Sequence, residues 1–568
     1  MMYIKTYEKW KNNSLFDMDL RTELSSLDII SDAKEIEDRF YSNLEFGTGG
    51  LRGVMGAGTN RVNKYTIGKA TKGLGNYLLD KFGYQVCAER GVAIAYDTRN
   101  NSKYFAQITA DILSGMGIKV YLHDDARPTP QLSFAVKYFQ ALAGVVITAS
   151  HNPKEYNGYK VYDEFGCQLV PWQAKELTKY VETVSDYATV DFSGNDSLIT
   201  KVDVTNEYVE ECLKQSRIQD IGVKNSLKVV YTPLHGSGYI PVMQVLKSDG
   251  FDNVIEVKEQ CILDGNFPTV VSPNPEDRKA LELGIEVAKE HYADVVLGTD
   301  PDSDRVGVAV KTATGYELLT GNQIGALLID FILCNTDLSR FSKPAVIKTE
   351  VTSELGAEIA RKYGINIFST LTGFKFIGEK LTQFDKAKKN VNEDQNFDFL
   401  FGYEESYGYL AGTHAQDKDA VVSTMLICEM AAYLKAQGKT LIDRINEIYT
   451  EYGYYLDALD SFTLKGKDGL ERINLIMKQL REEGVPFTNV AKVIDYTLDV
   501  AAEFGFGNLP KSNVLKYIFE DSSWIAVRPS GTEPKIKFYY SIKGENQEVA
   551  KERLKEYQIV IRNKFGLE

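Results

Sequence analysis

The sequence predicts an α/β protein with three related α/β domains, which have mixed sheets, and a smaller α+β domain at the C-terminal end. Short apolar runs alternate with amphipathic segments of helical period over residues 1–455, which is typical of α/β domains. Beyond about Leu456, strand-like runs follow one another closely, as in an antiparallel sheet. The length of 568 residues is also about four times that of an ordinary domain.

The first domain is expected at residues 1–200. A helix is expected to begin with the polar residues Asn101 and Ser102. We expect that helix to end near Gly115. Apolar runs rich in β-branched residues predict buried strands at Val92–Tyr96, Lys119–Leu122 and Gly144–Thr148.

The same alternation predicts a second domain at residues 201–315, a third at 316–455 and the α+β domain at 456–568. In the second domain we expect a helix that ends near Gln215, another after Gly238, and strands at Leu227–Tyr231 and Asp294–Leu297. In the third we expect helices at Asn322–Cys334, Glu354–Tyr363 and Asp419–Gln437, and strands at Ala345–Thr349 and Ile365–Phe368. In the last we expect strands at Val514–Phe519, Trp524–Val527 and Ile536–Ser541, and a charged helix at Asn546–Phe565.

The charge balance argues against a nucleic acid or an anionic membrane as partner. The chain has 65 Lys and Arg residues against 79 Asp and Glu residues, a net charge of −14, whereas such partners attract basic surfaces. If the substrate is an anion, the cations that bind it must be concentrated in one place.

The cysteines and the apolar runs indicate a cytoplasmic protein. The six cysteines are scattered without a CxxC pair, which is typical of reduced core residues. The N-terminal residues are polar and contain no apolar core of signal-peptide length. The most apolar run, Ile324–Cys334, is about half a bilayer span and contains Asp330.

Polar loops directly after apolar strands are the candidate site, because ligands of open α/β sheets bind beyond the carboxyl ends of strands. The first such loop is Thr148-Ala149-Ser150-His151-Asn152-Pro153. A hydroxyl on a sharp turn after a strand is exposed and can act as a nucleophile. An ordinary turn is the alternative. A Ser–His hydrolase is disfavoured, because the Gly-x-Ser-x-Gly elbow is missing.

The second loop, Asp300-Pro301-Asp302-Ser303-Asp304-Arg305, has carboxylates at alternate positions. Three carboxylates on one turn repel one another unless they share a hard cation. Three protein oxygens would leave a coordination position for a phosphate oxygen, which suits Mg²⁺ and phosphoryl chemistry. A solvated acidic turn is the alternative. An EF-hand is excluded, because Arg305 stands where that loop needs Gly.

Three further loops carry candidate binding groups. Arg528-Pro529-Ser530-Gly531-Thr532-Glu533-Pro534 offers a guanidinium, two hydroxyls and a glycine amide, which together could hold a phosphate. Gly402-Tyr403-Glu404-Glu405-Ser406-Tyr407-Gly408 offers carboxylates and a hydroxyl to a sugar. The glycine-rich segment from Phe46 to Gly53 carries Arg52 but lacks the Lys-Ser/Thr ending of a P-loop.

In this order, the five loops resemble those of the α-D-phosphohexomutase superfamily, the phosphoglucomutases and phosphomannomutases, from Phe46 to about Tyr540. The resemblance implies three α/β domains and a smaller fourth around a central cleft. It implies that Ser150 carries a phosphoryl group, that Asp300, Asp302 and Asp304 hold one Mg²⁺, and that the Ser150 phosphate is a further ligand. Glu404 and Ser406 would bind the sugar hydroxyls. The non-reacting phosphate would be bound by Arg528, Ser530, Gly531 and Thr532.

The reaction implied by the resemblance interconverts glucose 1-phosphate and glucose 6-phosphate through glucose 1,6-bisphosphate, with Arg52 and Arg305 balancing charge. The proton carrier stays open among His151, Lys160, Lys375 and His414. In bacterial enzymes that act on both sugars a histidine follows the sugar loop, whereas this chain has Gly408, so that base is not carried over.

Other sugars and other activities remain alternatives. The Glu-Glu-Ser-Tyr-Gly form of the sugar loop favours glucose, whereas mannose or a pentose phosphate would make it a phosphomannomutase or phosphopentomutase. A metal-dependent sugar phosphatase would leave the serine loop without a purpose, and a non-catalytic binding protein would not need Ser150 and all three aspartates. We expect a small-molecule sugar phosphate as partner and a monomer or small homo-oligomer.

Overall fold

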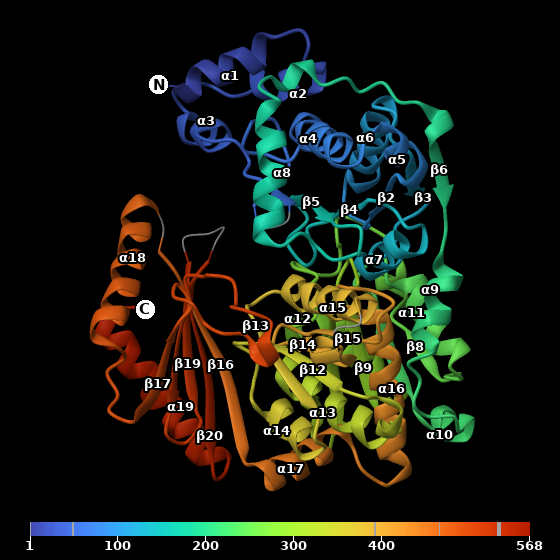
Figure 1. The fold of residues 1–568 in the computed structure, drawn as a ribbon, viewed down its shortest axis with the longest axis vertical. Coiled ribbons are helices and arrows are strands. Elements are labelled where there is room, and N and C mark those ends of the chain that lie inside the picture. The colour runs from blue at the N-terminus through green and yellow to red at the C-terminus, as the bar shows by residue number, and fades with distance from the viewer. Residues whose placement is uncertain (1, 48–49, 391–392, 465, 531–534, 568) are drawn as a thin grey trace. The chain divides into compact units, whose positions relative to one another are not determined.

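The computed structural model describes residues 2–47, 50–390, 393–464, 466–530 and 535–567. The chain forms two compact units (Figure 1). The first unit contains residues 1–318 and 408–429, and the second contains residues 319–407 and 430–568.

A six-stranded mixed sheet forms the first layer of the first unit, with strand order β1-β5-β4-β2-β3-β6. Its strands are β1 (Gly50–Val54), β2 (Val92–Tyr96), β3 (Val120–His123), β4 (Ala143–Ile147), β5 (Tyr156–Tyr162) and β6 (Ile199–Val202). The central strands β2 and β4 are parallel and fully buried, because their apolar side chains face helices on both sides of the sheet. The predicted strands here are confirmed to within one residue at either end.

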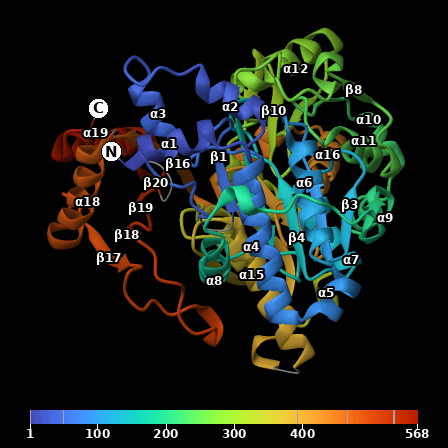
Figure 2. The same ribbon diagram turned by 90° about the horizontal axis from the view of Figure 1, so that it is seen from above.

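Helices of the first unit pack on this sheet through one apolar core. Its residues include Ile67 and Leu74 of α4, Phe105 and Ile112 of α6, and Leu177 of α8, and Figure 2 shows α4 and α6 side by side. The helices that precede the second sheet are α1 (Met2–Asn12), α2 (Met18–Ser25), α3 (Ala33–Phe40), α4 (Lys64–Phe82), α5 (Tyr84–Arg90), α6 (Ser102–Gly115), α7 (Thr129–Tyr138), α8 (Pro171–Thr183), α9 (Thr205–Leu213) and α10 (Ile221–Ser226).

The second sheet of this unit has the order β11-β10-β9-β7-β8 and is also mixed. Its strands are β7 (Val229–Thr232), β8 (Val254–Glu256), β9 (Val295–Thr299), β10 (Val306–Thr312) and β11 (Gly315–Leu318). The helices beside it are α11 (Tyr239–Ser248) and α12 (Arg278–His291). Strand β9 is fully buried and ends directly before the aspartate loop, as the sequence predicted.

The second unit begins with three parallel strands in the order β13-β12-β14. These are β12 (Pro344–Thr349), β13 (Asn366–Thr370) and β14 (Asp398–Glu404), with helices α13 (Gly321–Cys334), α14 (Leu355–Lys362), α15 (Phe374–Lys389) and α17 (Leu441–Tyr452). The short strand β15 (Gly408–Ala411) belongs to the first unit, and the boundary between the units runs through α16 (Ala420–Ala436).

An antiparallel sheet completes the second unit, with strand order β16-β20-β19-β18-β17. The strands are β16 (Tyr454–Thr463), β17 (Val490–Asp495), β18 (Leu515–Phe519), β19 (Trp524–Pro529) and β20 (Lys535–Gly544). Helices α18 (Gly466–Glu483) and α19 (Gln547–Phe565) cover one face (Figure 1) and share its core through Ile476 and Ile561. The predicted antiparallel sheet is confirmed.

One feature of the fold was not predicted, and another concerns the apolar run Ile324–Cys334. The N-terminal helices α1–α3 build a core of their own around Trp10, Phe16 and Phe40. The run Ile324–Cys334 lies inside α13, and among the described helices none combines the length and the apolarity that crossing a membrane requires.

Candidate active site

Ser150 lies three residues beyond the end of β4, in a turn that directs its hydroxyl at the aspartate loop. Its backbone has φ 53°, a left-handed conformation that is uncommon for a residue with a Cβ and marks strained functional turns. The backbone N–H donates to Oγ1 of Thr148 (2.8 Å), and Ser150 Oγ donates to Oδ2 of Asp300 (2.8 Å). Ser150 is only 4% exposed, so the turn fixes its hydroxyl inside the protein.

Asp97 and Arg99, in the loop after β2, hold this turn in place. Arg99 donates to the backbone carbonyl oxygens of Ser150 and Asn152 and, at 2.9 Å, to that of Pro153. Oδ2 of Asp97 accepts a hydrogen bond from the Thr148 hydroxyl (2.7 Å). Both side chains are buried. The strained serine turn is therefore held by hydrogen bonds from a neighbouring parallel strand.

The aspartate loop connects β9 and β10 and buries all three carboxylates. Asp300, Asp302 and Asp304 each offer an oxygen within 4.8 Å of the others, and they are at most 2% exposed. Burial, together with the charges of Asp304 and Asp302, raises the pKa of Asp300 well above its usual value. Oδ1 of Asp302 and Oδ1 of Asp304 make no hydrogen bond within the described structure. Buried carboxylate oxygens without a hydrogen bond are costly, so this donor set fits a hard metal ion.

Two lysines face the aspartate loop from other elements. Nζ of Lys160, on β5, lies 3.0 Å from Oδ2 of Asp302 and 3.6 Å from Oδ2 of Asp304. Nζ of Lys418 lies 3.1 Å from Oδ2 of Asp304. Burial alone would lower the pKa of Lys160, but Asp302 and Asp304 raise it above its usual value. Burial opposes ionisation of Asp304, yet Lys418 and Lys160 hold its pKa below the usual range. The lysines therefore balance part of the charge of the loop.

His151 and Arg305 complete this group of side chains. Nη1 of Arg305 donates to Nδ1 of His151 (2.8 Å) and forms an ion pair with Glu276 (3.1 Å). Burial, then the charge of Arg305, lowers the pKa of His151 well below its usual value. Nδ1 of His151 is also 3.3 Å from Ser150 Oγ. Arg52 lies on β1 with an exposed side chain, and its charge also lowers the pKa of His151.

The other predicted site residues lie elsewhere. His414 is buried, and its hydrogen-bond partners in the described structure are Asp419 and Cys212. In the second unit, Glu404 is buried at the end of β14, Ser406 lies in the following turn, and Lys375 lies in the first turn of α15. Arg528 is the last residue but one of β19, and the Ser530 N–H donates to the Lys535 carbonyl oxygen (2.7 Å). Gly531 and Thr532 lie outside the described residues.

The sequence matches, in order, four profiles of one family. They are described as phosphoglucomutase/phosphomannomutase alpha/beta/alpha domain I at residues 43–188, domain II at 206–315, domain III at 320–452 and the C-terminal domain at 473–558. The chain belongs to the phosphoglucomutase/phosphomannomutase family. The predicted fold class is confirmed, with three α/β/α domains that have mixed sheets and an antiparallel C-terminal domain.

Relatives with known names lie in the same family. The chain is 39% identical to a phosphoglucomutase of Staphylococcus haemolyticus over 538 residues, which cover 92% of this chain and 94% of that protein. It is 40% identical to a phosphoglucomutase of Staphylococcus aureus strain USA300, over 90% of this chain and 92% of that protein. The crystal structure of parafusin, a phosphoglucomutase from Paramecium, shares the fold with a TM-score of 0.71 at 15% identity, over 92% of this chain and 96% of that chain.

Three residues that contact the serine or the aspartate loop were not predicted from the sequence. Asp97 and Arg99 follow a buried strand, so the rule that selected the serine and aspartate loops could also have selected them. Lys418 stands in the segment 414–419, from which the sequence reasoning chose His414 instead. No local signal distinguishes Lys418 from an exposed lysine, because its partner Asp304 is more than a hundred residues away in the sequence.

Proposed function

We propose that this member of the phosphoglucomutase/phosphomannomutase family is a phosphoglucomutase, an isomerase that interconverts glucose 1-phosphate and glucose 6-phosphate. The observation that carries the proposal is the placement of Ser150 Oγ, held 2.8 Å from Asp300 beside two further buried carboxylates. The two staphylococcal relatives, both named phosphoglucomutase, support glucose as the sugar.

Ser150 is the residue that carries the phosphoryl group between substrates. In the forward direction, Ser150 phosphate transfers its phosphoryl group to the free hydroxyl of the sugar phosphate, which becomes glucose 1,6-bisphosphate. The P–O bond to Ser150 breaks as the bond to the sugar oxygen forms. The sugar hydroxyl proton passes to a protein base, and the leaving Ser150 oxygen takes up a proton. After the bisphosphate has turned over, Ser150 Oγ gives up its proton and accepts the other phosphoryl group, while the P–O bond to the sugar breaks and that sugar oxygen is protonated. The strained, buried turn keeps the serine oxygen in line and limits the access of water.

Asp300, Asp302 and Asp304 are the proposed ligands of one Mg²⁺, with an oxygen of the Ser150 phosphate as a further ligand. When bound, the ion would neutralise charge on the phosphoryl oxygens during transfer. This metal site depends on Oδ1 of Asp302 and Oδ1 of Asp304, which make no hydrogen bond among the residues that the structure describes.

The cations beside the aspartate loop bind and balance the phosphoryl group. Lys160 and Lys418 lie within 4 Å of aspartate oxygens. Arg305 donates a hydrogen bond to His151, and the charge of Arg52 lowers the pKa of the same imidazole. We propose that Lys160 and Lys418 bind the phosphoryl oxygens as cations and supply a proton to the oxygen that leaves phosphorus. The low pKa of His151 makes it a poor base near neutral pH, so its proposed role is to hold Arg305.

The remaining predicted residues are proposed to contact the sugar and the phosphate that does not react. Glu404 and Ser406 bind the sugar hydroxyls, and Lys375 contacts a phosphate or carries a proton. Arg528, Ser530, Gly531 and Thr532 bind the phosphate that does not react. Each of the four proposed domains, at 1–200, 201–315, 316–455 and 456–568, then contributes at least one functional loop.

One assay tests the proposed function against its alternatives. The protein is mixed with Mg²⁺, a trace of the matching bisphosphate, and glucose 1-phosphate, mannose 1-phosphate or ribose 1-phosphate, and both the isomer and free phosphate are measured. We expect the 6-phosphate isomer from glucose 1-phosphate with the highest kcat/KM. Preference for mannose or ribose, or release of free phosphate alone, would contradict the proposal.

We also propose a cytoplasmic location, which the six free cysteines support.

A further inference from the structure

The residues directly before and after Asp419 both contact the aspartate loop. Asp419 ends the segment 414–419, which precedes α16. The preceding residue, Lys418, places its Nζ 3.1 Å from Asp304. The following residue, Ala420, donates its backbone N–H to the carbonyl oxygen of Ser303 (3.2 Å). Asp419 is itself fully buried. The position of Lys418 against the aspartate loop therefore depends on how the Asp419 side chain is held.

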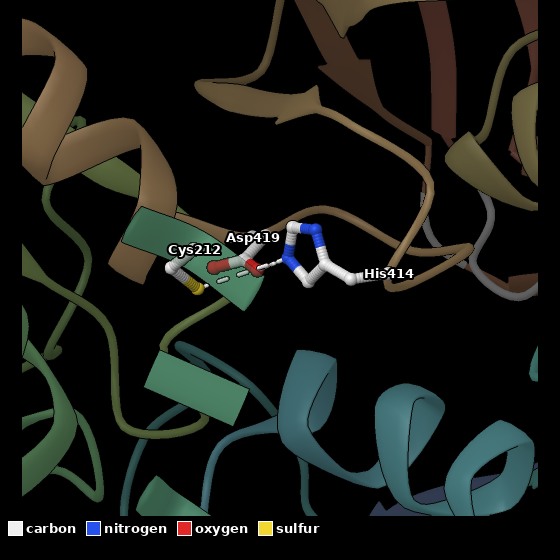
Figure 3. Close-up of side chains that lie close together, drawn as sticks. All are labelled: Cys212, His414 and Asp419. Atoms are coloured by element: carbon white, nitrogen blue, oxygen red, sulfur yellow. Dashed lines mark hydrogen bonds and ion pairs between the residues drawn. The ribbon is translucent and has the colours of Figure 1, made fainter. Parts of the chain in front are cut away.

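The carboxylate of Asp419 accepts four hydrogen bonds. Oδ1 accepts from the backbone N–H groups of Val421 (2.9 Å) and Val422 (3.0 Å), which lie in the first turn of α16, and from the hydroxyl of Tyr208 (2.7 Å). Oδ2 accepts from Nε2 of His414 (2.7 Å), as Figure 3 shows. The hydrogen bonds from Val421 and Val422 cap the start of α16. Tyr208 and His414 hold the carboxylate from outside this helix.

Tyr208 ties this carboxylate to the core of the first unit. It lies one helical turn before Cys212 on α9, so both residues are on the same face of the helix. The Cys212 thiol is 3.8 Å from Nε2 of His414 (Figure 3). Burial and the charge of Asp419 raise the pKa of Tyr208 well above its usual value, so its hydroxyl keeps the proton that it donates.

The sulfur, nitrogen and oxygen of Cys212, His414 and Asp419 lie close enough together to hold a metal ion. The hydrogen bonds favour a different role. Nε2 of His414 needs its proton to donate to Asp419, and a protonated nitrogen cannot be a metal ligand. Oδ1 of Asp419 already has three donors. In contrast to Oδ1 of Asp302 and Oδ1 of Asp304, which accept no hydrogen bond within the described structure, both oxygens of Asp419 already have donors, although Nδ1 of His414 has no partner there.

We propose that Tyr208 and His414 are positioning residues, which act through Asp419 to hold Lys418 against Asp304. The proposal rests on the proposed function, in which Lys418 serves phosphoryl transfer. Neighbouring contacts serve the same end: the Tyr162 hydroxyl donates to Asp417 (2.7 Å), and the Gln416 N–H donates to Ser133 Oγ (2.8 Å). A lysine side chain has four rotatable bonds, so its ammonium reaches one place reproducibly only if its backbone is fixed.

A double-mutant cycle on the full-length protein tests the proposal. Because small displacements of a reacting group are costly, we expect Tyr208→Phe to lower kcat about tenfold, with KM changed less than about twofold. Lys418→Ala should lower kcat further, and the double variant Tyr208→Phe/Lys418→Ala should match Lys418→Ala alone. The control is Tyr316→Phe, which also loses a buried hydroxyl, one that donates to backbone carbonyl oxygens of Ala288 and Ala293 in the second sheet. Its kcat should be unchanged.

Two results would overturn the proposal. If the two kcat losses multiply in the double variant, Tyr208 acts independently of Lys418. If Lys418→Ala keeps wild-type kcat, there is nothing for Tyr208 to position. The proposed function is tested separately, by wild-type activity on glucose 1-phosphate and by its loss in Ser150→Ala.

His414 provides a second test, which does not depend on Tyr208. His414→Ala removes the donor to Asp419, whereas His414→Gln places a side-chain N–H near the position of Nε2. We expect His414→Gln to restore most of the kcat that His414→Ala loses, with melting temperature and circular dichroism recorded for both. A glutamine cannot carry a proton in catalysis, so if both variants are equally inactive although folded, His414 is itself the proton carrier and the positioning role is wrong.

Discussion

The hydroxyl of Ser150 donates a 2.8 Å hydrogen bond to Asp300, a residue 150 positions away in the sequence. The two residues follow the ends of β4 and β9, in two different sheets of the first unit. The hydroxyl and the buried carboxylates are thus brought together in one compact part of the chain, where a phosphoryl group on Ser150 would meet the metal ligands that we propose.

Ser150→Ala should abolish mutase activity, because the alanine has no oxygen to carry a phosphoryl group. We expect a loss of at least about a thousandfold in kcat, as when other enzymes lose their nucleophile. Peptide mass spectrometry of the wild-type protein should find phosphate on Ser150. The control is Ser248→Ala, at the exposed end of α11, which should behave as wild type. Turnover by Ser150→Ala near the wild-type rate would refute the assignment.

Mg²⁺ should stabilise the protein through the aspartate loop. At a Mg²⁺ concentration about a hundred times the Kd, binding to the folded state adds about 2.7 kcal/mol to the free energy of unfolding. We expect Mg²⁺ to raise the melting temperature of the wild-type protein, and Asp302→Asn to lose most of that rise together with the activity. Asp252→Asn, an exposed aspartate of the same unit, is the control. Activity that survives a strong chelator would argue against a metal at this loop.

Arg528→Ala should weaken binding of the substrate phosphate, since a buried phosphate needs charge-assisted donors. We expect kcat/KM to fall by an amount equivalent to roughly 2–5 kcal/mol of transition-state binding, mainly through a higher KM. Arg528→Lys should recover only part of it, because an ammonium cannot reproduce the planar fork of the guanidinium. Arg481→Ala, at an exposed ion pair with Asp495 in the same domain, should have no effect. A kcat/KM within about twofold of wild type in Arg528→Ala would show that this loop does not bind the phosphate.

Lys380 should make the stability of the protein depend on pH above neutrality. It is 6% exposed, its Nζ lies 4.1 Å from the ring centre of Phe506, and burial lowers its pKa from 10.5 to about 8. Between these two values the unfolded chain holds more protons at this lysine than the folded protein does, so stability rises with pH across that window. Below pH 8, burial of the protonated Lys380 lowers the free energy of unfolding by the full amount, roughly 3 kcal/mol.

Lys380→Met should therefore raise the melting temperature at pH 7 by a few degrees. The gain over wild type should shrink as the pH rises from 8 to 10, which differential scanning calorimetry can follow. Lys389→Met, an exposed residue of the same helix, is the control and should show no such trend. If the gain in melting temperature of Lys380→Met stayed constant with pH, burial of the charged Lys380 would not be destabilising the folded protein.

Local sequence patterns predicted the strands and the two chemical loops of the first unit. Val92–Tyr96 and Asp294–Leu297 were predicted from apolar runs, because a strand covered on both faces needs an unbroken apolar sequence. Ser150 and the three aspartates were predicted from their places after such strands. Asn101 does precede α6, but its backbone is left-handed and its side chain makes no capping hydrogen bond. The position of the helix start was thus right.

Contacts between distant segments were decided only by the tertiary structure. The sequence determined the fold class, the order of the domains, and the kinds of side chain available for phosphoryl chemistry, since these follow from periodicity and residue type within short windows. It did not determine that Lys418 meets Asp304, that Arg99 holds the serine turn, or that Tyr208 and His414 share Asp419. It also missed the helices α1–α3, whose Trp10 and Phe16 are buried partly against Tyr65 and Tyr187. Each of these contacts depends on the order of strands in a sheet and on side-chain packing across tens to hundreds of residues, which no local pattern encodes.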